Sequence, residues 1–190
     1  MAKLKLGIVV GSNRRQSINR KLAEALARLG AGDFDAAFIR IDDLPIYNQD
    51  NEQPLPQQVA RFKAEVEAAD ALLFVTPEHS RSIPAVLKNA IDWGNRPYGK
   101  SSWRGKPAAI IGTSGGVIST AVAQQHLRAV LGSLGLHTMG GEAYIQFKPD
   151  MIDGENHVPD ESVRQFLKAF VDGFAGFAGR FVPERAAVAA

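Results

Sequence analysis

The first candidate for chemistry is a polar segment that follows a short apolar run near the start of the chain. Residues 11–19 read Gly-Ser-Asn-Arg-Arg-Gln-Ser-Ile-Asn and lead into a segment with helical spacing. Free backbone N–H groups, the positive end of a helix dipole and hydroxyl donors together bind anions. The segment lacks the Lys of a Walker A sequence and the repeated glycines of a dinucleotide fingerprint. We therefore expect a terminal monophosphate here, the alternative being that Ser17 only caps a helix and the arginines face solvent.

A second polar segment, residues 76–84, follows another apolar run and is bracketed by prolines that stiffen it. A stiff loop of this kind can present backbone amides to the edge of a flat heterocycle. Arg81 is either an anion contact or a surface charge. His79 could be read as a general base or a metal ligand, but the other histidines are distant in sequence, so we expect no metal site.

A third segment, residues 112–116, reads Gly-Thr-Ser-Gly-Gly and also follows an apolar run. It matches the G-x-S-x-G pattern of an esterase nucleophile elbow, with Ser114 as the nucleophile. The partners of such a triad would be His137 or His157 with a downstream aspartate. In the alternative reading, the two glycines let the backbone approach a planar ligand, and Thr113 and Ser114 serve as donors.

The elements that must position these segments are apolar runs alternating with amphipathic ones. Runs at residues 4–10, 34–41, 71–76 and 108–113 lack polar alternation, as strands buried on both faces do, and 138–147 is a weaker fifth candidate. Segments with apolar residues at helical spacing lie between these runs. We predict an α/β fold of three layers, α/β/α, around a doubly wound five-stranded parallel sheet in the order 2-1-3-4-5. Ligands of such sheets bind at the carboxyl ends of the strands, so the three polar segments should meet.

The helix ends and the remaining segments complete this prediction. Ser17 should cap the first helix, and Asp160 should cap a last helix over residues 161–181. The apolar stripe of that last helix is assigned to core packing, and it comprises Val163, Phe166, Phe170, Phe174 and Phe177. The long connection 42–56 is a candidate for shaping the pocket or reaching a second subunit. Residues 1–182 are predicted to form one domain, and residues 183–190 a flexible tail.

Composition excludes several classes of function. The chain has 190 residues with 22 Lys+Arg against 20 Asp+Glu, and this small formal charge of +2 gives no support to nucleic-acid binding. There is no cysteine, so a disulfide, a thiolate metal site and a cysteine nucleophile are excluded. No run approaches the roughly 18 apolar residues that span a bilayer, and the N-terminal run is too short for a signal peptide. We expect a cytoplasmic protein without a membrane partner, whose redox chemistry, if any, belongs to a cofactor.

A flavin would account for all three polar segments, with its phosphate in the first and its ring between the second and third. The strings GSNRRQSIN, TPEHSRSIPAVLKNAIDW and GTSGG together resemble the NADPH-dependent FMN reductase family of flavodoxin-like proteins, in particular its quinone and chromate reductases. The resemblance covers residues 4–177. It implies noncovalent FMN and a ping-pong transfer of two electrons from NADPH or NADH to quinones or similar acceptors, possible ones being chromate and free flavin. It also implies a homodimer or homotetramer.

The resemblance also assigns residues to the site. Its phosphate contacts fall on Ser12, Arg14, Ser17, Ile18 and Asn19. Its ring contacts fall on Pro77, Glu78, His79, Ser80 and Arg81, joined by Ser114 and Gly115. No side chain is given a catalytic role, because the flavin carries the chemistry, and the proton source is left open among solvent, His79 and Glu78.

Two departures from the family pattern and one rival reading accompany this assignment. Many relatives have Tyr-Asn where this chain has His79 and Ser80, so the acceptor pocket should differ in shape. Arg128 and Glu142 resemble positions of a network between subunits, although both can also be plain surface charges. A nonenzymatic electron carrier would use the same FMN site, but such carriers dock through a strongly acidic face, which a charge of +2 does not favour.

Overall fold

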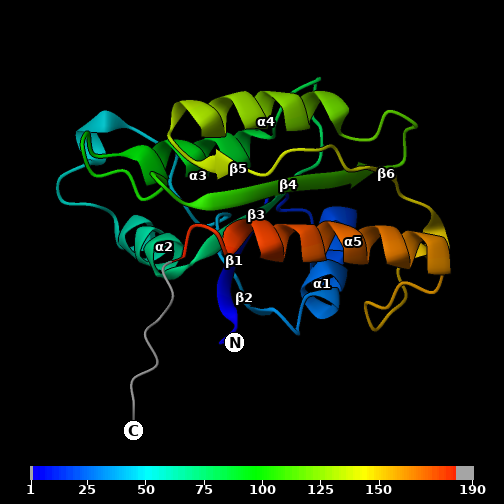
Figure 1. Ribbon diagram of the computed structural model, residues 1–190. Coiled ribbons are helices and arrows are strands. Elements are labelled where there is room, and N and C mark those ends of the chain that lie inside the picture. The colour runs from blue at the N-terminus through cyan, green and yellow to red at the C-terminus, as the bar shows by residue number, and fades with distance from the viewer. Residues whose placement is uncertain (1, 183–190) are drawn as a thin grey trace, which may run out of the picture.

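The structure, a computed structural model, describes residues 2–182 and has a central parallel sheet (Figure 1). The strands follow the order β2-β1-β3-β4-β5, and a short sixth strand, β6, pairs with β4. This confirms the predicted doubly wound order. The strands are β1 (Leu4–Val10), β2 (Phe34–Phe38), β3 (Ala71–Val75), β4 (Pro107–Ser114), β5 (His137–Thr138) and β6 (Tyr144–Gln146).

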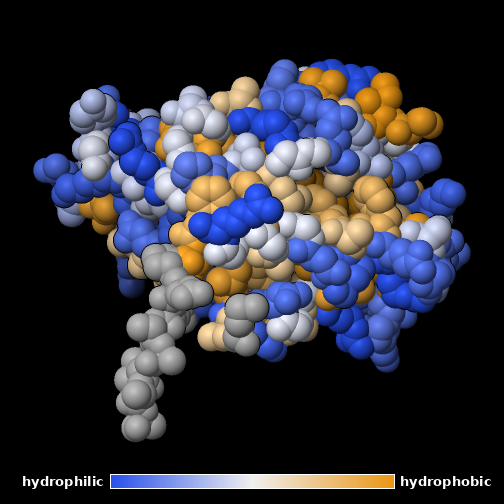
Figure 2. Space-filling view, in the orientation of Figure 1, coloured by the Kyte–Doolittle hydropathy of each residue, from blue (hydrophilic) through white to orange (hydrophobic). Residues whose placement is uncertain are grey.

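Within residues 2–182, five α-helices cover both faces of the sheet and complete the predicted three layers. On one face, α1 and α5 share a hydrophobic core with the sheet; on the other face, α2, α3 and α4 share a second core. The helices are α1 (Ile18–Leu29), α2 (Gln57–Ala68), α3 (Ala85–Asn95), α4 (Ala121–Ser133) and α5 (Glu161–Ala178), with short 3-10 turns η1 (Gln49–Asn51) and η2 (Pro149–Met151). In the space-filling view, hydrophobic surface gathers between α4 and α5 on a face that is otherwise largely hydrophilic (Figure 2).

The predicted fifth strand is the part of the sheet that differs from expectation. Instead of one run over 138–147, β5 pairs with the amino-terminal part of β4 and β6 with its carboxyl-terminal part. Between them the backbone turns at Gly141, whose φ is 84°. The guanidinium of Arg128 on α4 donates to the carbonyl oxygens of Met139 (2.6 Å) and Gly141 (2.9 Å). The strand is therefore interrupted by a turn at Gly141. Carbonyl groups at this turn accept hydrogen bonds from Arg128 in place of bonds from a neighbouring strand.

The helix caps agree with the prediction, whereas the apolar stripe of the last helix agrees only in part. Ser17 accepts a hydrogen bond from the backbone N of Arg20, and Asp160 caps α5 in the same way. Phe174 is buried and packs on Phe34, with ring centroids 5.6 Å apart. Phe166 is 46% exposed, so its assignment to the core was wrong. The next residue, Leu167, takes the inward position and is buried in the core that contains Phe174, so Phe166 is left facing solvent.

The long connection 42–56 is fixed against α3. The carbonyl oxygen of Pro45 accepts hydrogen bonds from Asn89 Nδ2 (3.0 Å) and Trp93 Nε1 (2.7 Å). The backbone N of Tyr47 donates to Asn89 Oδ1 at 2.7 Å. This connection therefore has a fixed conformation beside the carboxyl ends of the strands.

Within residues 2–182, none of the helices combines the length and hydropathy that crossing a lipid bilayer requires. The same part of the chain holds no group of three or more histidine, aspartate or glutamate side chains that could bind a metal ion.

Candidate functional site

The three polar loops meet because β1, β3 and β4 are neighbours in the sheet. Val75 lies beside Val10 on one side and beside Ile111 on the other. The ladder continues past the strand ends, where Gly11 N donates to Val75 O (2.8 Å) and Thr76 N donates to Ile111 O (2.9 Å). The loops after these strands therefore start side by side at one edge of the sheet, as the topology predicted.

The first loop ends at the amino terminus of α1 and fits a phosphate. Ser17 caps the helix, because its Oγ accepts a hydrogen bond from the backbone N–H of Arg20 at 3.2 Å. The N–H groups of Ile18 and Asn19 belong to the first turn, where a helix provides no intrahelical partner. Ser12 Oγ accepts from the backbone N of Arg14 at 3.4 Å within the loop. Backbone N–H groups, two hydroxyls and the positive end of α1 thus belong to one short segment, a combination that can bind an anion.

Asn19 plays a part that the sequence did not reveal. Its Nδ2 donates to the carbonyl oxygen of Thr113 (2.9 Å), and its Oδ1 accepts from the N–H of Thr113 (3.0 Å). Asn19 is only 1% exposed. Its side chain therefore joins the first loop to the third, which leaves its backbone N–H for the predicted phosphate contact.

The second loop contains a tight turn in which His79 and Ser82 exchange two backbone hydrogen bonds of 2.9 Å. Between them, Ser80 and Arg81 have φ values of 49° and 60°. Two consecutive positive φ values define a type I′ turn, a conformation in which residues other than glycine and asparagine are strained. The turn is therefore held in a fixed shape at the end of β3.

Glu78 ties this turn to α4. Its Oε2 accepts from the N–H groups of Val122 and Ala123, both at 3.0 Å, while its Oε1 accepts from Arg81 NH1 at 3.0 Å. The Glu78 side chain is only 8% exposed. The carboxylate acts as a cap for α4. The predicted contact of Glu78 to a ring is therefore left to its backbone.

The third loop is closely packed at its start and open at its tip. A Cβ on Gly112 would lie 2.0 Å from the carbonyl oxygen of Thr76, so only glycine fits where the second and third loops touch. Ser114 Oγ donates to Ser119 O (3.1 Å) and accepts from Gly116 N (3.2 Å). A Cβ on Gly115 would meet nothing within 4 Å. Backbone at the tip is therefore accessible to a planar ligand.

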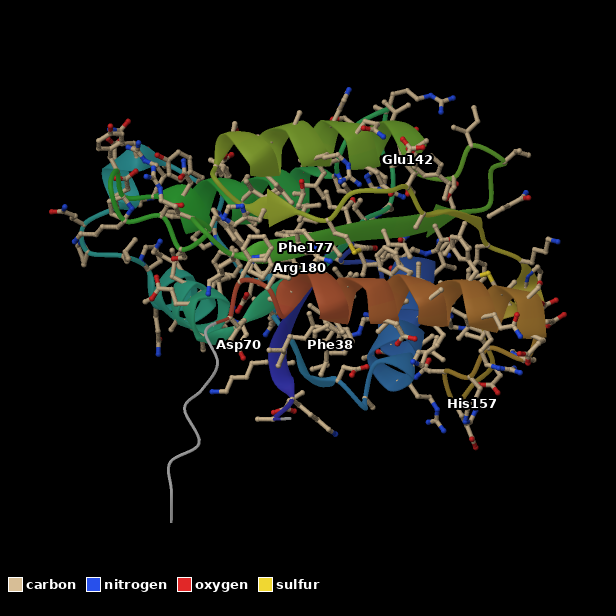
Figure 3. The ribbon with its side chains drawn as sticks, viewed as in Figure 1. Phe38, Asp70, Glu142, His157, Phe177 and Arg180 are labelled. Atoms are coloured by element: carbon tan, nitrogen blue, oxygen red, sulfur yellow. The ribbon has the colours of Figure 1, made fainter. Side chains whose placement is uncertain are left out.

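The residues of the esterase alternative do not come together. His137 pairs with Pro107 at the amino end of β4, whereas Ser114 ends that strand. His157 lies in the loop before α5, where its Nδ1 is 3.2 Å from Asp153 Oδ2 (Figure 3). In the part of the chain that the structure describes, no histidine bonds to Ser114. A nucleophile without a base cannot perform acyl transfer.

Arg128 and Glu142 are not paired with one another within the chain. Arg128 holds the turn between β5 and β6, and Glu142 accepts from Gln125 Nε2 at 2.7 Å. Figure 3 shows Glu142 beside α4. Their expected role between subunits stays a prediction.

Comparison with known proteins agrees with this geometry. The family description "NADPH-dependent FMN reductase" matches residues 4–150. A 2-hydroxy-1,4-benzoquinone reductase from a Burkholderia species is 47% identical over 175 residues, which cover 92% of this chain and 96% of that protein. A quinone reductase of Pseudomonas putida is 44% identical over 174 residues, or 90% of this chain and 93% of that protein.

Among solved structures, FerB, a flavoenzyme NAD(P)H:(acceptor) oxidoreductase from Paracoccus denitrificans, superimposes with a TM-score of 0.91 at 43% identity. The match covers 94% of this chain and 98% of FerB. The matched span contains all three loops, and the chain belongs to the NADPH-dependent FMN reductase family.

Proposed function

We propose that this chain is an FMN-dependent oxidoreductase that passes two electrons from NADPH or NADH to quinones or similar small acceptors. The observation that carries the proposal is the convergence of the three loops at one edge of the sheet, joined by Asn19 and Glu78. The names of the relatives, quinone reductases and an NAD(P)H:(acceptor) oxidoreductase, support the same class of reaction.

The first loop would hold the phosphate of noncovalent FMN. Hydroxyls of Ser12 and Ser17 and the N–H groups of Ile18 and Asn19 supply donors, and Arg14 adds a positive charge. Bound FMN would supply the chemistry of hydride and electron transfer between the nicotinamide and the acceptor. The chain therefore needs to bind and orient the flavin and its substrates and to exclude water. It needs no side-chain nucleophile.

The second and third loops would hold the ring. The backbone from Pro77 to Arg81 would contact the ring from the second loop, and Ser114 and Gly115 from the open tip of the third. The Glu78 carboxylate is engaged by the start of α4 and by Arg81, whereas His79 is exposed. This geometry favours His79 or solvent over Glu78 as the proton source.

A ping-pong cycle follows from one open ring face that must receive donor and acceptor in turn. Steady-state rates measured at several NADPH and quinone concentrations should give parallel double-reciprocal lines. Intersecting lines would instead indicate that both substrates are bound together. Chromate and free flavin are further proposed acceptors, because an open face discriminates weakly between electron acceptors.

Replacement of Ser114 by alanine tests this function against the esterase alternative. We expect Ser114→Ala to weaken FMN binding by about tenfold or less, since one hydrogen-bonding group is lost. The rate of quinone reduction at saturating FMN should be retained. Ser133→Ala, at the exposed end of α4, is the matched control. Hydrolysis of a p-nitrophenyl ester that disappears in Ser114→Ala would contradict the proposal.

Self-association and a cytoplasmic location complete the proposal. Val117 and Ile118, at the tip of the third loop, are 85% and 57% exposed, and Ile46 is 86% exposed. Exposed apolar side chains next to a binding site support burial against a second copy of the chain. Light scattering coupled to size exclusion should find a dimer or tetramer.

A further inference from the structure

A cavity of about 440 Å³ lies beside the first loop, on the side away from the other two loops. Its walls come from the segment after β1, the first turn of α1 and the end of β2 with the residues that follow. Three arginines face it, Arg14, Arg20 and Arg40, together with the ring of Phe38 and the carboxylate of Asp42. Three guanidinium groups around one cavity indicate a binding site for an anion.

Arg20 is held in place with donors to spare. Its guanidinium carbon lies 3.7 Å from the centroid of the Phe38 ring, a cation–π arrangement that fixes the plane of the group. Its Nε donates to Glu24 Oε1 at 2.7 Å, which leaves the two terminal nitrogens for another acceptor. The planar donors of Arg20 are thus oriented before any ligand arrives.

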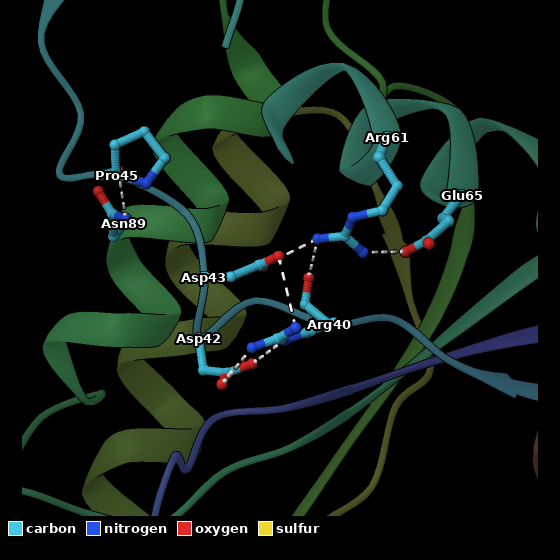
Figure 4. A network of polar contacts seen from close by, with 7 residues as sticks. All are labelled: Arg40, Asp42, Asp43, Pro45, Arg61, Glu65 and Asn89. Atoms are coloured by element: carbon cyan, nitrogen blue, oxygen red, sulfur yellow. Dashed lines mark hydrogen bonds and ion pairs between the residues drawn. The ribbon is translucent and has the colours of Figure 1, made fainter. Parts of the chain in front are cut away.

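Arg40 is engaged more fully than Arg20, because each of its guanidinium nitrogens faces a carboxylate. It donates through Nε (2.8 Å) and NH2 (3.3 Å) to Asp42, and its NH1 lies 3.9 Å from Asp43 (Figure 4). Arg61 in turn bonds Asp43 and the backbone carbonyl of Arg40. Arg40 therefore forms a rigid wall of the cavity.

Arg14 completes the cationic side of the cavity. Its side chain has no ion pair with a carboxylate within residues 2–182. Arg14 thus adds a positive charge that no acidic side chain of residues 2–182 compensates, while Arg20, although paired with Glu24, keeps two guanidinium nitrogens for an anion.

The position of the cavity relates it to the proposed flavin site. Neighbouring strands lie about 4.8 Å apart, so the end of β2 is roughly 12 Å from the crevice between β3 and β4. An extended dinucleotide, whose two nucleotides are joined by a pyrophosphate, spans such a distance. A donor with its nicotinamide at the flavin can therefore place its adenosine half at this cavity.

We propose that this cavity binds the 2′-phosphate on the adenosine ribose of NADPH through Arg20, and so makes the chain prefer NADPH to NADH. The 2′-phosphate is the only group by which the two donors differ, and it is a dianion that guanidinium groups bind in bidentate fashion. The inference rests on the proposed function, because it assumes that the nicotinamide reaches the flavin.

Binding of 2′,5′-ADP and 5′-AMP, measured by calorimetry, tests the cavity without any electron transfer. We expect 2′,5′-ADP to bind at least about tenfold more tightly than 5′-AMP, and Arg20→Gln to abolish that difference. In turnover, the ratio of kcat/KM for NADPH to that for NADH should fall by about 10-fold to 100-fold in Arg20→Gln. Arg20→Lys, which keeps the charge but loses the planar fork, should fall in between.

Arg28→Gln is the matched control, because Arg28 is an exposed arginine in the last turn of α1. In Arg28→Gln, the preference for 2′,5′-ADP over 5′-AMP and the ratio of kcat/KM for NADPH to that for NADH should both equal those of the parent chain. Equal binding of 2′,5′-ADP and 5′-AMP by the parent chain would overturn the proposal, as would equal losses with NADPH and NADH in Arg20→Gln. FMN uptake is measured on the same preparations, so failure of the proposed function would be seen separately.

Discussion

At the scale of single residues, the carboxylate of Glu78 connects the turn after β3 with the start of α4. It accepts two helix N–H groups and one guanidinium N–H while its side chain is 8% exposed. We expect Glu78→Gln to lower the free energy of unfolding by about 1–3 kcal/mol, because hydrogen bonds to a charged, buried group are among the stronger ones. Urea unfolding followed by circular dichroism measures the change.

Glu161→Gln is the control for this variant, since Glu161 pairs with Arg164 at the exposed start of α5. That change should cost no more than about 1 kcal/mol, as exposed pairs do. If Glu78→Gln were no more destabilising than Glu161→Gln, the cap on α4 would be unimportant for stability.

Glu52 provides a test by pH. Its Oε1 accepts from Arg96 Nε (2.6 Å) and from the Tyr47 hydroxyl (2.8 Å). The bond from Arg96 holds the pKa of Glu52 below its ordinary value of 4.5, and the bond to Glu52 raises the pKa of Tyr47. Because the folded-state pKa is lowered, the unfolded chain binds the proton more readily. The stability that Glu52 contributes is present above pH 4.5 and is lost as the pH falls through the lowered pKa.

Urea midpoints of the parent chain and Glu52→Gln check this expectation between about pH 6 and about pH 3. The parent should be the more stable at the upper end, and the gap should narrow on acidification. A gap that stays constant over this range would mean that the charge of Glu52 does not stabilise the connection 42–56.

At the scale of elements, the sequence predicted the sheet order and the meeting of the three loops because both follow from local patterns. Apolar runs mark buried strands, and parallel topology then places their ends together. The contacts of Asn19 with Thr113 and of Glu78 with Val122 could not be predicted, since they join positions 94 and 44 residues apart. The division of the fifth strand likewise depends on the bonds of Arg128 to carbonyl groups 11 and 13 residues further on, and the hydrophobic periodicity does not reveal these bonds.

The bond between α1 and β4 gives a prediction at this scale. Asn19→Leu, which keeps the branched arrangement of side-chain heavy atoms, would leave the N–H and the carbonyl oxygen of Thr113 buried without partners. We expect a loss of about 2–4 kcal/mol in the free energy of unfolding together with weaker FMN binding. Asn51→Leu, on the exposed turn η1, is the control. Unchanged stability in Asn19→Leu would show that α1 and β4 hold their positions without this pair of hydrogen bonds.

At the scale of the whole molecule, two hydrophobic cores hold helices on opposite faces of one sheet. The site occupies the carboxyl edge, where the chain order reverses between β1 and β3. Polar loops form this edge, and hydrogen bonds that join them to one another and to α4 fix their shape. The molecule is thus organised to bind a ligand that touches three loops at once.

Titration of the purified chain with FMN, followed by addition of NADPH without oxygen, tests this account most directly. We expect one FMN to bind per chain, with a change in its visible absorption band, and the band to bleach when NADPH is added. A chain that neither binds FMN nor alters its spectrum would contradict the account, because the three loops would then serve some other ligand.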